Sequence, residues 1–143
     1  MNTTTRSTNQ ATYQRLYDAI GSRDLGQIAR TVDELFHPDA VFHGGPPDAE
    51  SAGAAVKTAW TMLLKAFPDI SVTVEDTIAE ADKVVFRNTV TGTHRGDYRG
   101  LPATGKKINY SEMFIIRFAD GKVAEGWGIV DLYSQLQQLG VRS

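Results

Sequence analysis

Four ionisable residues lie in stretches with the apolar neighbours and alternation of β-strands: Arg87, Glu112, Glu125 and Asp131. A carboxylate enclosed by Trp and Ile side chains loses hydration, which raises its pKa and lets it transfer protons near neutral pH. Asp131 stands where a strand pattern gives way to a helix pattern, so helix capping and acid/base catalysis are equally compatible with its position. Glu112 or Glu125 could instead pair with Arg87 or Arg117.

The three histidines are His37, His43 and His94, and their spacing does not match a metal site. The chain has no H-E-x-x-H motif and no acidic cluster beside any two histidines, so no metal is predicted. His43 precedes a Gly-Pro loop, and His94 ends a strand pattern. Each of these two is placed to reach a cavity, either as a catalytic residue or as a hydrogen-bonded structural one.

The segment from Gly100 to Lys106 has the G-x-x-x-x-G-K spacing of a phosphate-binding loop. However, the segment after it has a strand pattern, Lys107 stands where Ser or Thr would bind magnesium, and Pro102 removes a backbone donor. A nucleotide site is therefore not expected. The chain also lacks cysteine and a G-x-S-x-G motif, so neither thiolate nor serine nucleophiles are indicated.

The composition is typical of one globular domain, with 143 residues, 41% hydrophobic residues and a formal net charge of -2. No basic segment suggests a nucleic-acid partner. The first ten residues lack the apolar core of a signal peptide or membrane anchor. We expect a single cytoplasmic domain spanning residues 1–143, with residues 1–7 frayed and no membrane partner.

The predicted elements run from helices to strands, an order that indicates an α+β fold. Caps and periodicity predict helices beginning at Ser7, Asp24 and Ser51, a short strand over residues 40–43, strands from Ile70 onward and a last helix ending at Gly140. Asp120 and Gly121 predict a tight hairpin turn. The first arm of this hairpin is apolar on both faces, so one face should cover a core or cavity and the other should meet another sheet or subunit.

Several short motifs follow one another in a recognisable order. They are FPD (67–69), VED (74–76), GTH (92–94), GLPATGK (100–106), DGK (120–122), E-x-W (125–127) and QQLG (137–140). Together they resemble the SnoaL-like polyketide cyclase family of the nuclear-transport-factor-2-like superfamily. The resemblance implies a curved antiparallel sheet that forms a cone-shaped barrel closed by the N-terminal helices, and a homodimer through the outer sheet face.

The best-known members of that family close a ring of an aromatic polyketide by aldol chemistry, without metal or cofactor, using one pocket aspartate. An ungapped alignment through residues 120–122 and 138–140 puts Gly128 at the position of that aspartate and Phe114 at that of a pocket histidine. Both departures count against an identical mechanism. A shared fold does not by itself determine the reaction. Gly128 would enlarge the pocket where the cyclase has its aspartate.

We therefore expect a cofactor-independent, cyclase-like enzyme acting on a hydrophobic small molecule. Asp131 is predicted as the acid/base, with His94, Glu112 and Arg87 as candidates for polarising a carbonyl. The residues predicted to line the pocket are Trp127, Phe114, Tyr17, Trp60, His43, Tyr110 and Gly128. The alternatives are a non-catalytic binding or assembly module and an auxiliary protein of polyketide hydroxylation.

Overall fold

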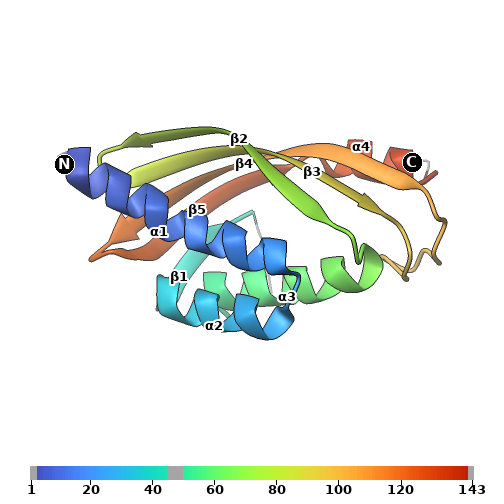
Figure 1. The fold of residues 1–143 in the computed structure, drawn as a ribbon, viewed down its shortest axis with the longest axis horizontal. Coiled ribbons are helices and arrows are strands. Elements are labelled where there is room, and N and C mark those ends of the chain that lie inside the picture. The colour runs from blue at the N-terminus through green and yellow to red at the C-terminus, as the bar shows by residue number, and fades with distance from the viewer. Residues whose placement is uncertain (1–2, 45–49, 142–143) are drawn as a thin grey trace.

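Helices and one curved sheet form separate layers in the computed structural model, which describes residues 3–44 and 50–141 (Figure 1). The helices are α1 (Thr3–Ser22), α2 (Leu25–Leu35), α3 (Ala52–Ala66) and α4 (Leu132–Gln138). The strands are β1 (Phe36–His43), β2 (Ser71–Glu80), β3 (Lys83–Thr93), β4 (Lys107–Ala119) and β5 (Lys122–Val130). Helices α1, α2 and α3 gather on one side of the sheet, and α4 lies at one end. The predicted α+β class is confirmed.

The sheet has the strand order β1-β5-β4-β3-β2. The pairs β2–β3, β3–β4 and β4–β5 are antiparallel, but β1 runs parallel to β5. Two expectations are thereby corrected: the sheet is mixed, and it is curved but not closed into a barrel. Strand β1 is followed by a helix rather than by a hairpin, so its connection imposes no antiparallel partner. It adds to β5 as an edge strand.

The predicted caps of α2 and α3 are confirmed. The N–H of Gln27 donates to the Asp24 carboxylate at 3.1 Å, and the N–H of Ala54 donates to the Ser51 hydroxyl at 3.1 Å. These bonds satisfy backbone donors that have no partner within the helix. The hairpin turn is also confirmed, because Asp120 and Gly121 adopt positive φ angles of 53° and 77°.

Two element boundaries differ from the predictions. Helix α1 begins at Thr3, before the expected cap at Ser7. Residues 1 and 2, and the Gly-Pro loop over residues 45–49, lie outside the described residues. Strand β1 begins at Phe36 although Pro38 follows, because an edge strand tolerates a proline that donates no ladder hydrogen bond.

Alternate residues of each strand face opposite sides of the sheet. We call the side that packs against α1, α2 and α3 the inner face, and the opposite side the outer face. The strand β4 illustrates the difference: Tyr110, Ile116 and Phe118 are buried on the inner face, whereas Met113 and Ile115 are exposed on the outer face. The doubly apolar strand predicted from the sequence thus divides between a core and an uncovered surface.

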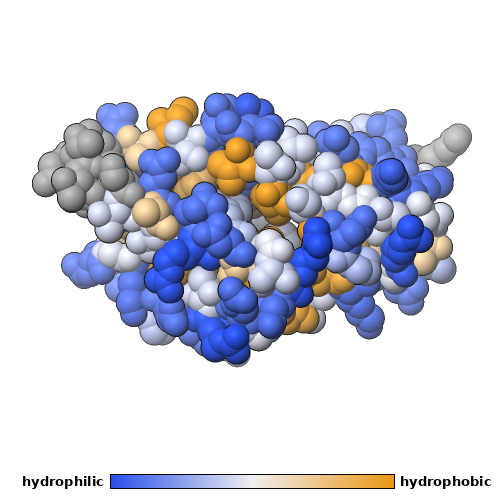
Figure 2. Space-filling view, in the orientation of Figure 1, coloured by the Kyte–Doolittle hydropathy of each residue, from blue (hydrophilic) through white to orange (hydrophobic). Residues whose placement is uncertain are grey.

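Hydrophilic residues cover most of the helical layer in the lower half of the view, and apolar residues reach the surface at several places in the upper half (Figure 2). The helices are therefore amphipathic, with the apolar side against the sheet. None of the helices described combines the length and the apolar character needed to cross a bilayer.

Gly128 packs beneath two aromatic rings. A Cβ atom there would lie 2.4 Å from the ring of Phe114 and 2.8 Å from that of Phe42. These rings contact each other, with centroids 5.9 Å apart. Gly128 therefore makes room for the Phe114 ring, which occupies the space that the expected pocket enlargement would need.

We predict that Gly128→Ala lowers the free energy of unfolding by about 1–3 kcal/mol, because the added methyl group overpacks this contact. Urea denaturation measures the loss. A Gly128→Ala/Phe114→Leu double variant should recover part of it by removing the clashing ring atoms. The control is Gly21→Ala, where a Cβ would meet no atom within 4 Å. A Gly128→Ala protein as stable as the wild type would contradict the packing argument.

Candidate active site

One polar cluster interrupts the apolar inner face. Asn88 on β3 and Glu112 on β4 are directly paired across the two strands. The Asn88 amide nitrogen donates to Glu112 Oε1 at 3.1 Å and to the Tyr17 hydroxyl, from α1, at 2.9 Å. Three elements distant in the sequence thus bring together a carboxyl, an amide and a phenol, which we call the inner polar cluster.

The environment of Glu112 favours its neutral form. Burial raises the pKa of Glu112 from 4.5 to about 7, although the hydrogen bond from Asn88 lowers it. Burial also raises the pKa of the Tyr17 and Tyr110 phenols, so both stay protonated at neutral pH. A carboxyl with a pKa near 7 can both accept and release a proton under ordinary conditions.

The other inner-face residues around Glu112 are mainly aromatic. Tyr110 and Phe114 flank it at two-residue spacing on β4, and so share its face. Trp60 on α3 packs against both hydrophobic clusters of the protein. Of the predicted lining residues, the structure places Tyr17, Trp60, Tyr110, Phe114 and Gly128 on the inner side.

His43, Trp127 and Arg87 lie on the outer face. The rings of His43 and Trp127 stack with centroids 5.2 Å apart. Arg87 precedes Asn88 in β3 and so points to the opposite side, where its Nε donates to Asp76 at 2.6 Å. None of the three joins Glu112, because a strand presents its successive side chains to opposite faces.

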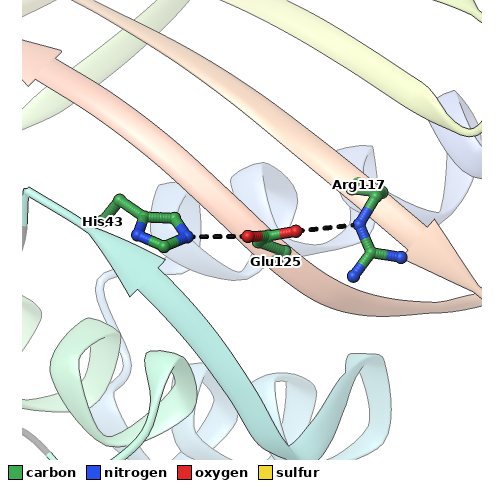
Figure 3. A network of polar contacts seen from close by, with 3 residues as sticks. All are labelled: His43, Arg117 and Glu125. Atoms are coloured by element: carbon green, nitrogen blue, oxygen red, sulfur yellow. Dashed lines mark hydrogen bonds and ion pairs between the residues drawn. The ribbon is translucent and has the colours of Figure 1, made fainter.

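A second polar cluster occupies the outer face (Figure 3). The Glu125 carboxylate accepts hydrogen bonds from His43 Nε2 at 2.7 Å and from Arg117 Nε at 3.0 Å. These two bonds hold the pKa of Glu125 below its ordinary value. The adjoining depression has a volume of about 390 Å³ and is lined by His37, Asp39, Val41, His43, Arg117, Ala124 and Glu125. Glu125 stays ionised near neutral pH, so it is a weaker candidate acid than Glu112.

Asp131 is an exposed helix cap. Its carboxylate accepts hydrogen bonds from the Ser134 N–H at 3.1 Å and the Ser134 hydroxyl at 2.8 Å. Both bonds lower the pKa of Asp131, in contrast to the raised pKa of Glu112. The capping alternative therefore describes what Asp131 does in the structure, and an ionised surface carboxylate is a weak proton donor at neutral pH.

His94 holds a loop rather than facing the inner polar cluster. Its Nδ1 accepts a hydrogen bond from the Thr104 N–H at 3.2 Å, and its backbone bonds to Gly105 and Lys106. Its ring is fully buried beside Phe67. Because His94 follows Asn88 by six positions, roughly 20 Å of strand separates the two residues. The segment with phosphate-loop spacing, residues 100–106, is thus a connection that hydrogen bonds to His94 hold in place.

Asn88 is the member of the inner polar cluster that sequence reasoning missed. Asparagine is depleted in strands, so its place between Arg87 and Thr89 in an apolar β pattern is itself a signal. Its role depends on a pairing with Glu112 that only the sheet register reveals. Among the described residues, no three His, Cys, Asp or Glu side chains are grouped as a metal site would require.

Comparisons with known proteins give a consistent result. The SnoaL-like polyketide cyclase family matches residues 10–139. The chain is 27% identical over 129 residues to the aklanonic acid methyl ester cyclase DnrD of Streptomyces peucetius, covering 89% of this chain and 87% of DnrD.

Two solved structures extend this likeness. IdmH, a candidate polyketide cyclase from Streptomyces antibioticus, is 33% identical with a TM-score of 0.76, covering 93% of this chain and 99% of IdmH. AclR, a candidate hydroxylase from Streptomyces galilaeus, is 32% identical with a TM-score of 0.80, covering 94% of this chain and 97% of AclR. With a family match over most of its length and a fold shared with these proteins, the chain belongs to the SnoaL-like polyketide cyclase family.

Proposed function

We propose that this protein is a cofactor-independent cyclase that uses Glu112 as its acid/base on a hydrophobic, polyketide-like molecule bound at the inner face. The observation that carries the proposal is the half-buried Glu112 carboxyl on the inner face, which Asn88 contacts and whose pKa of about 7 suits it to move protons in both directions. Membership of a polyketide cyclase family and the likeness to DnrD support the substrate class.

In the proposed reaction, the Glu112 carboxylate takes a proton from a carbon next to a carbonyl. The electron pair of that C–H bond forms an enolate, whose carbon attacks a second carbonyl of the same molecule and closes a ring. The alkoxide so formed takes the proton back from Glu112. Substrate and product are isomers, and the apolar walls contribute by holding a flexible chain in a reactive conformation.

Glu112 suits this role better than the residue predicted from the sequence. Asp131 is exposed and its pKa is lowered, so it would be a poor proton donor. The position that the family resemblance gives to an aspartate is Gly128, and a side chain there would meet the Phe114 ring. Glu112, two residues before Phe114 on the same face of β4, supplies a carboxyl from the neighbouring strand instead.

The likeness to AclR favours hydroxylation as a second candidate function. Glu112 would then deprotonate the substrate, molecular oxygen would supply the added atom, and an external two-electron reductant with two protons would convert the second oxygen atom to water. Mass spectrometry separates the two functions, because cyclisation leaves the mass unchanged whereas hydroxylation adds one oxygen. Saturable binding without any mass change or rearrangement would favour a binding module.

The first prediction concerns proton exchange in D₂O with 2-tetralone, a bicyclic aromatic ketone with hydrogens next to its carbonyl. We expect the protein to catalyse deuterium incorporation, with a rate that rises as the pH increases through about 7, because the ionised carboxylate is the base. Glu112→Gln should lower the catalysed rate by about 10²-fold or more. NMR spectroscopy follows the exchange.

The matched control is Asp131→Asn, which makes the same carboxylate-to-amide change at a position where asparagine still caps a helix. Its exchange rate should equal that of the wild type. Loss of exchange in Asp131→Asn with full activity in Glu112→Gln would reverse the assignment of the acid/base.

The second prediction concerns stability. Because the pKa of Glu112 is about 7 in the fold against an ordinary 4.5, the fold favours the protonated form. This stabilising contribution is fully present below about pH 4.5 and is lost as the pH rises through 7. Glu112→Gln should therefore be more stable than the wild type at pH 8, by up to roughly 3 kcal/mol.

Urea denaturation at pH 4.5 and pH 8 measures this effect. The advantage of Glu112→Gln should shrink at the lower pH, where the wild-type carboxyl is protonated in the folded state. A stability difference independent of pH between these values would contradict a raised pKa at Glu112.

We also propose that the outer face associates with the same face of a second copy. Its exposed apolar side chains are Val41, Ile78, Met113, Ile115 and Ile129. Cationic and anionic side chains alternate around them, as in the pairs of Arg87 with Asp76 and of Arg117 with Glu125. A surface with both signs of charge can meet its own copy across a two-fold axis without net repulsion.

The third prediction follows from this arrangement. Met113→Glu should convert a dimer to a monomer in analytical ultracentrifugation, because it buries a charge at the centre of the apolar surface. Met62→Glu is the control, since Met62 is 37% exposed on α3 and Met113 is 48% exposed on β4. A wild-type protein that sediments as a monomer at high micromolar concentration would refute the dimer.

A further inference from the structure

The inner polar cluster contains a hydrogen-bond donor that the acid/base role of Glu112 does not use. The Tyr17 hydroxyl oxygen accepts a hydrogen bond from Asn88, and among the described residues no acceptor lies within bonding distance of its own hydrogen. A phenol can donate and accept at the same time. The Tyr17 O–H is therefore available to a bound molecule.

Aromatic packing fixes the position of this donor. The Tyr17 ring packs edge-on against Tyr13 and Phe86, with centroid distances of 5.4 Å and 5.3 Å. Such contacts hold the ring between α1 and β3 and leave the hydroxyl at the inner polar cluster. A donor held in place before the reaction stabilises developing charge without reorganising.

Asn88 sets the distance between this donor and the base. Both hydrogens of its amide nitrogen are used, one toward Tyr17 at 2.9 Å and one toward Glu112 at 3.1 Å. Because these hydrogens diverge in one plane, the Tyr17 oxygen and Glu112 Oε1 lie roughly 5 Å apart. We expect a carbonyl and its neighbouring carbon to bridge this separation, with the carbon toward Glu112 and the oxygen toward Tyr17.

A third group points to the chemistry of the ligand. Asn88 is fully buried, and its Oδ1 has no hydrogen-bond partner among the described residues. An ionised Glu112 keeps the amide nitrogen on its own side, since two acceptor oxygens repel each other. An unpaired buried acceptor destabilises the fold, and a hydroxyl or enol of a bound molecule would offset that cost.

We infer that Tyr17 donates a hydrogen bond to the enolate oxygen of the substrate, and that Asn88 is the positioning residue that holds Tyr17 and Glu112 at a fixed separation. The substrate is then a ketone with a neighbouring hydroxyl or enol, as in an enolised β-diketone. This inference rests on the proposed acid/base role of Glu112. When Glu112 removes the proton, the electron pair of the C–H bond moves into the new C=C bond and the carbonyl oxygen becomes the anion that Tyr17 binds.

Tyr17→Phe tests the donor, because it keeps the packed ring and removes only the hydroxyl. Loss of one such donor should lower kcat for deuterium exchange of 2-tetralone by about 10²-fold. We expect a smaller change in KM and an unchanged midpoint of the pH profile. Tyr133→Phe is the matched control, since Tyr133 is 68% exposed on α4 and lies outside the inner polar cluster. Its kcat should equal that of the wild type.

Binding of 2-naphthol provides a readout that does not depend on turnover. Its phenolate mimics a conjugated enolate, so Tyr17→Phe should weaken its binding at high pH by about tenfold or more, and Tyr133→Phe should not. Fluorescence titration measures both. Circular dichroism verifies that each variant is folded.

Asn88→Leu tests the positioning role. It removes the hydrogen bond that lowers the pKa of Glu112, so the midpoint of the exchange profile should move to higher pH. A substitution that merely loosened the fold would change the rate without moving this midpoint.

The outcomes separate the two proposals. If Glu112→Gln abolishes exchange but Tyr17→Phe changes neither exchange nor naphthol binding, the donor role is overturned and the acid/base role stands. If no exchange occurs but Tyr17→Phe weakens naphthol binding, the acid/base role fails and the donor stands. If the wild type neither exchanges nor binds naphthol, both are overturned.

Discussion

The chemistry of the inner face depends on one constraint: a carboxyl group is enclosed between a sheet and a helical layer with a single amide as its described donor. Removing hydration from Glu112 favours its neutral form, while the Asn88 hydrogen bond favours the ionised form, and the balance lies near neutrality. The same burial costs stability whenever the group ionises. The proposed function of Glu112 and the stability of the fold are therefore opposed at this position.

The alternation of the strands distributes the polar residues between two distinct surfaces. On the inner face, Glu112 and Asn88 are surrounded by apolar side chains that limit water. On the outer face, Glu125 is paired with two cationic or neutral donors and remains acidic. Two glutamates on adjacent strands thus have pKa values displaced in opposite directions, because one is desolvated and the other is hydrogen-bonded at the surface.

Packing at Gly128 connects the departures from the family pattern. The Phe114 ring occupies the space above Gly128, so the two residues depend on each other sterically. A carboxylate on β5 at this position would compete with that ring, whereas a carboxyl on β4 two residues earlier avoids it. The inner face therefore has aromatic rings over Gly128 on β5 and a carboxyl, Glu112, on the neighbouring strand β4, where the proposed proton transfer would occur.

The sequence by itself determined the local structure, because caps, periodicity and turn chemistry act between residues close in the chain. Asp24, Ser51 and the Asp120-Gly121 turn were sufficient for the element order and, with the ordered motifs, for the family. The sequence could not determine how β3 and β4 pair, since the connection over residues 94–106 is not a tight turn that sets a register. A shift of one residue would move Glu112 away from Asn88. Only the tertiary structure decided that Glu112 and Tyr17 both contact Asn88 on the inner face. Trp127, His43 and Arg87 lie on the outer face instead.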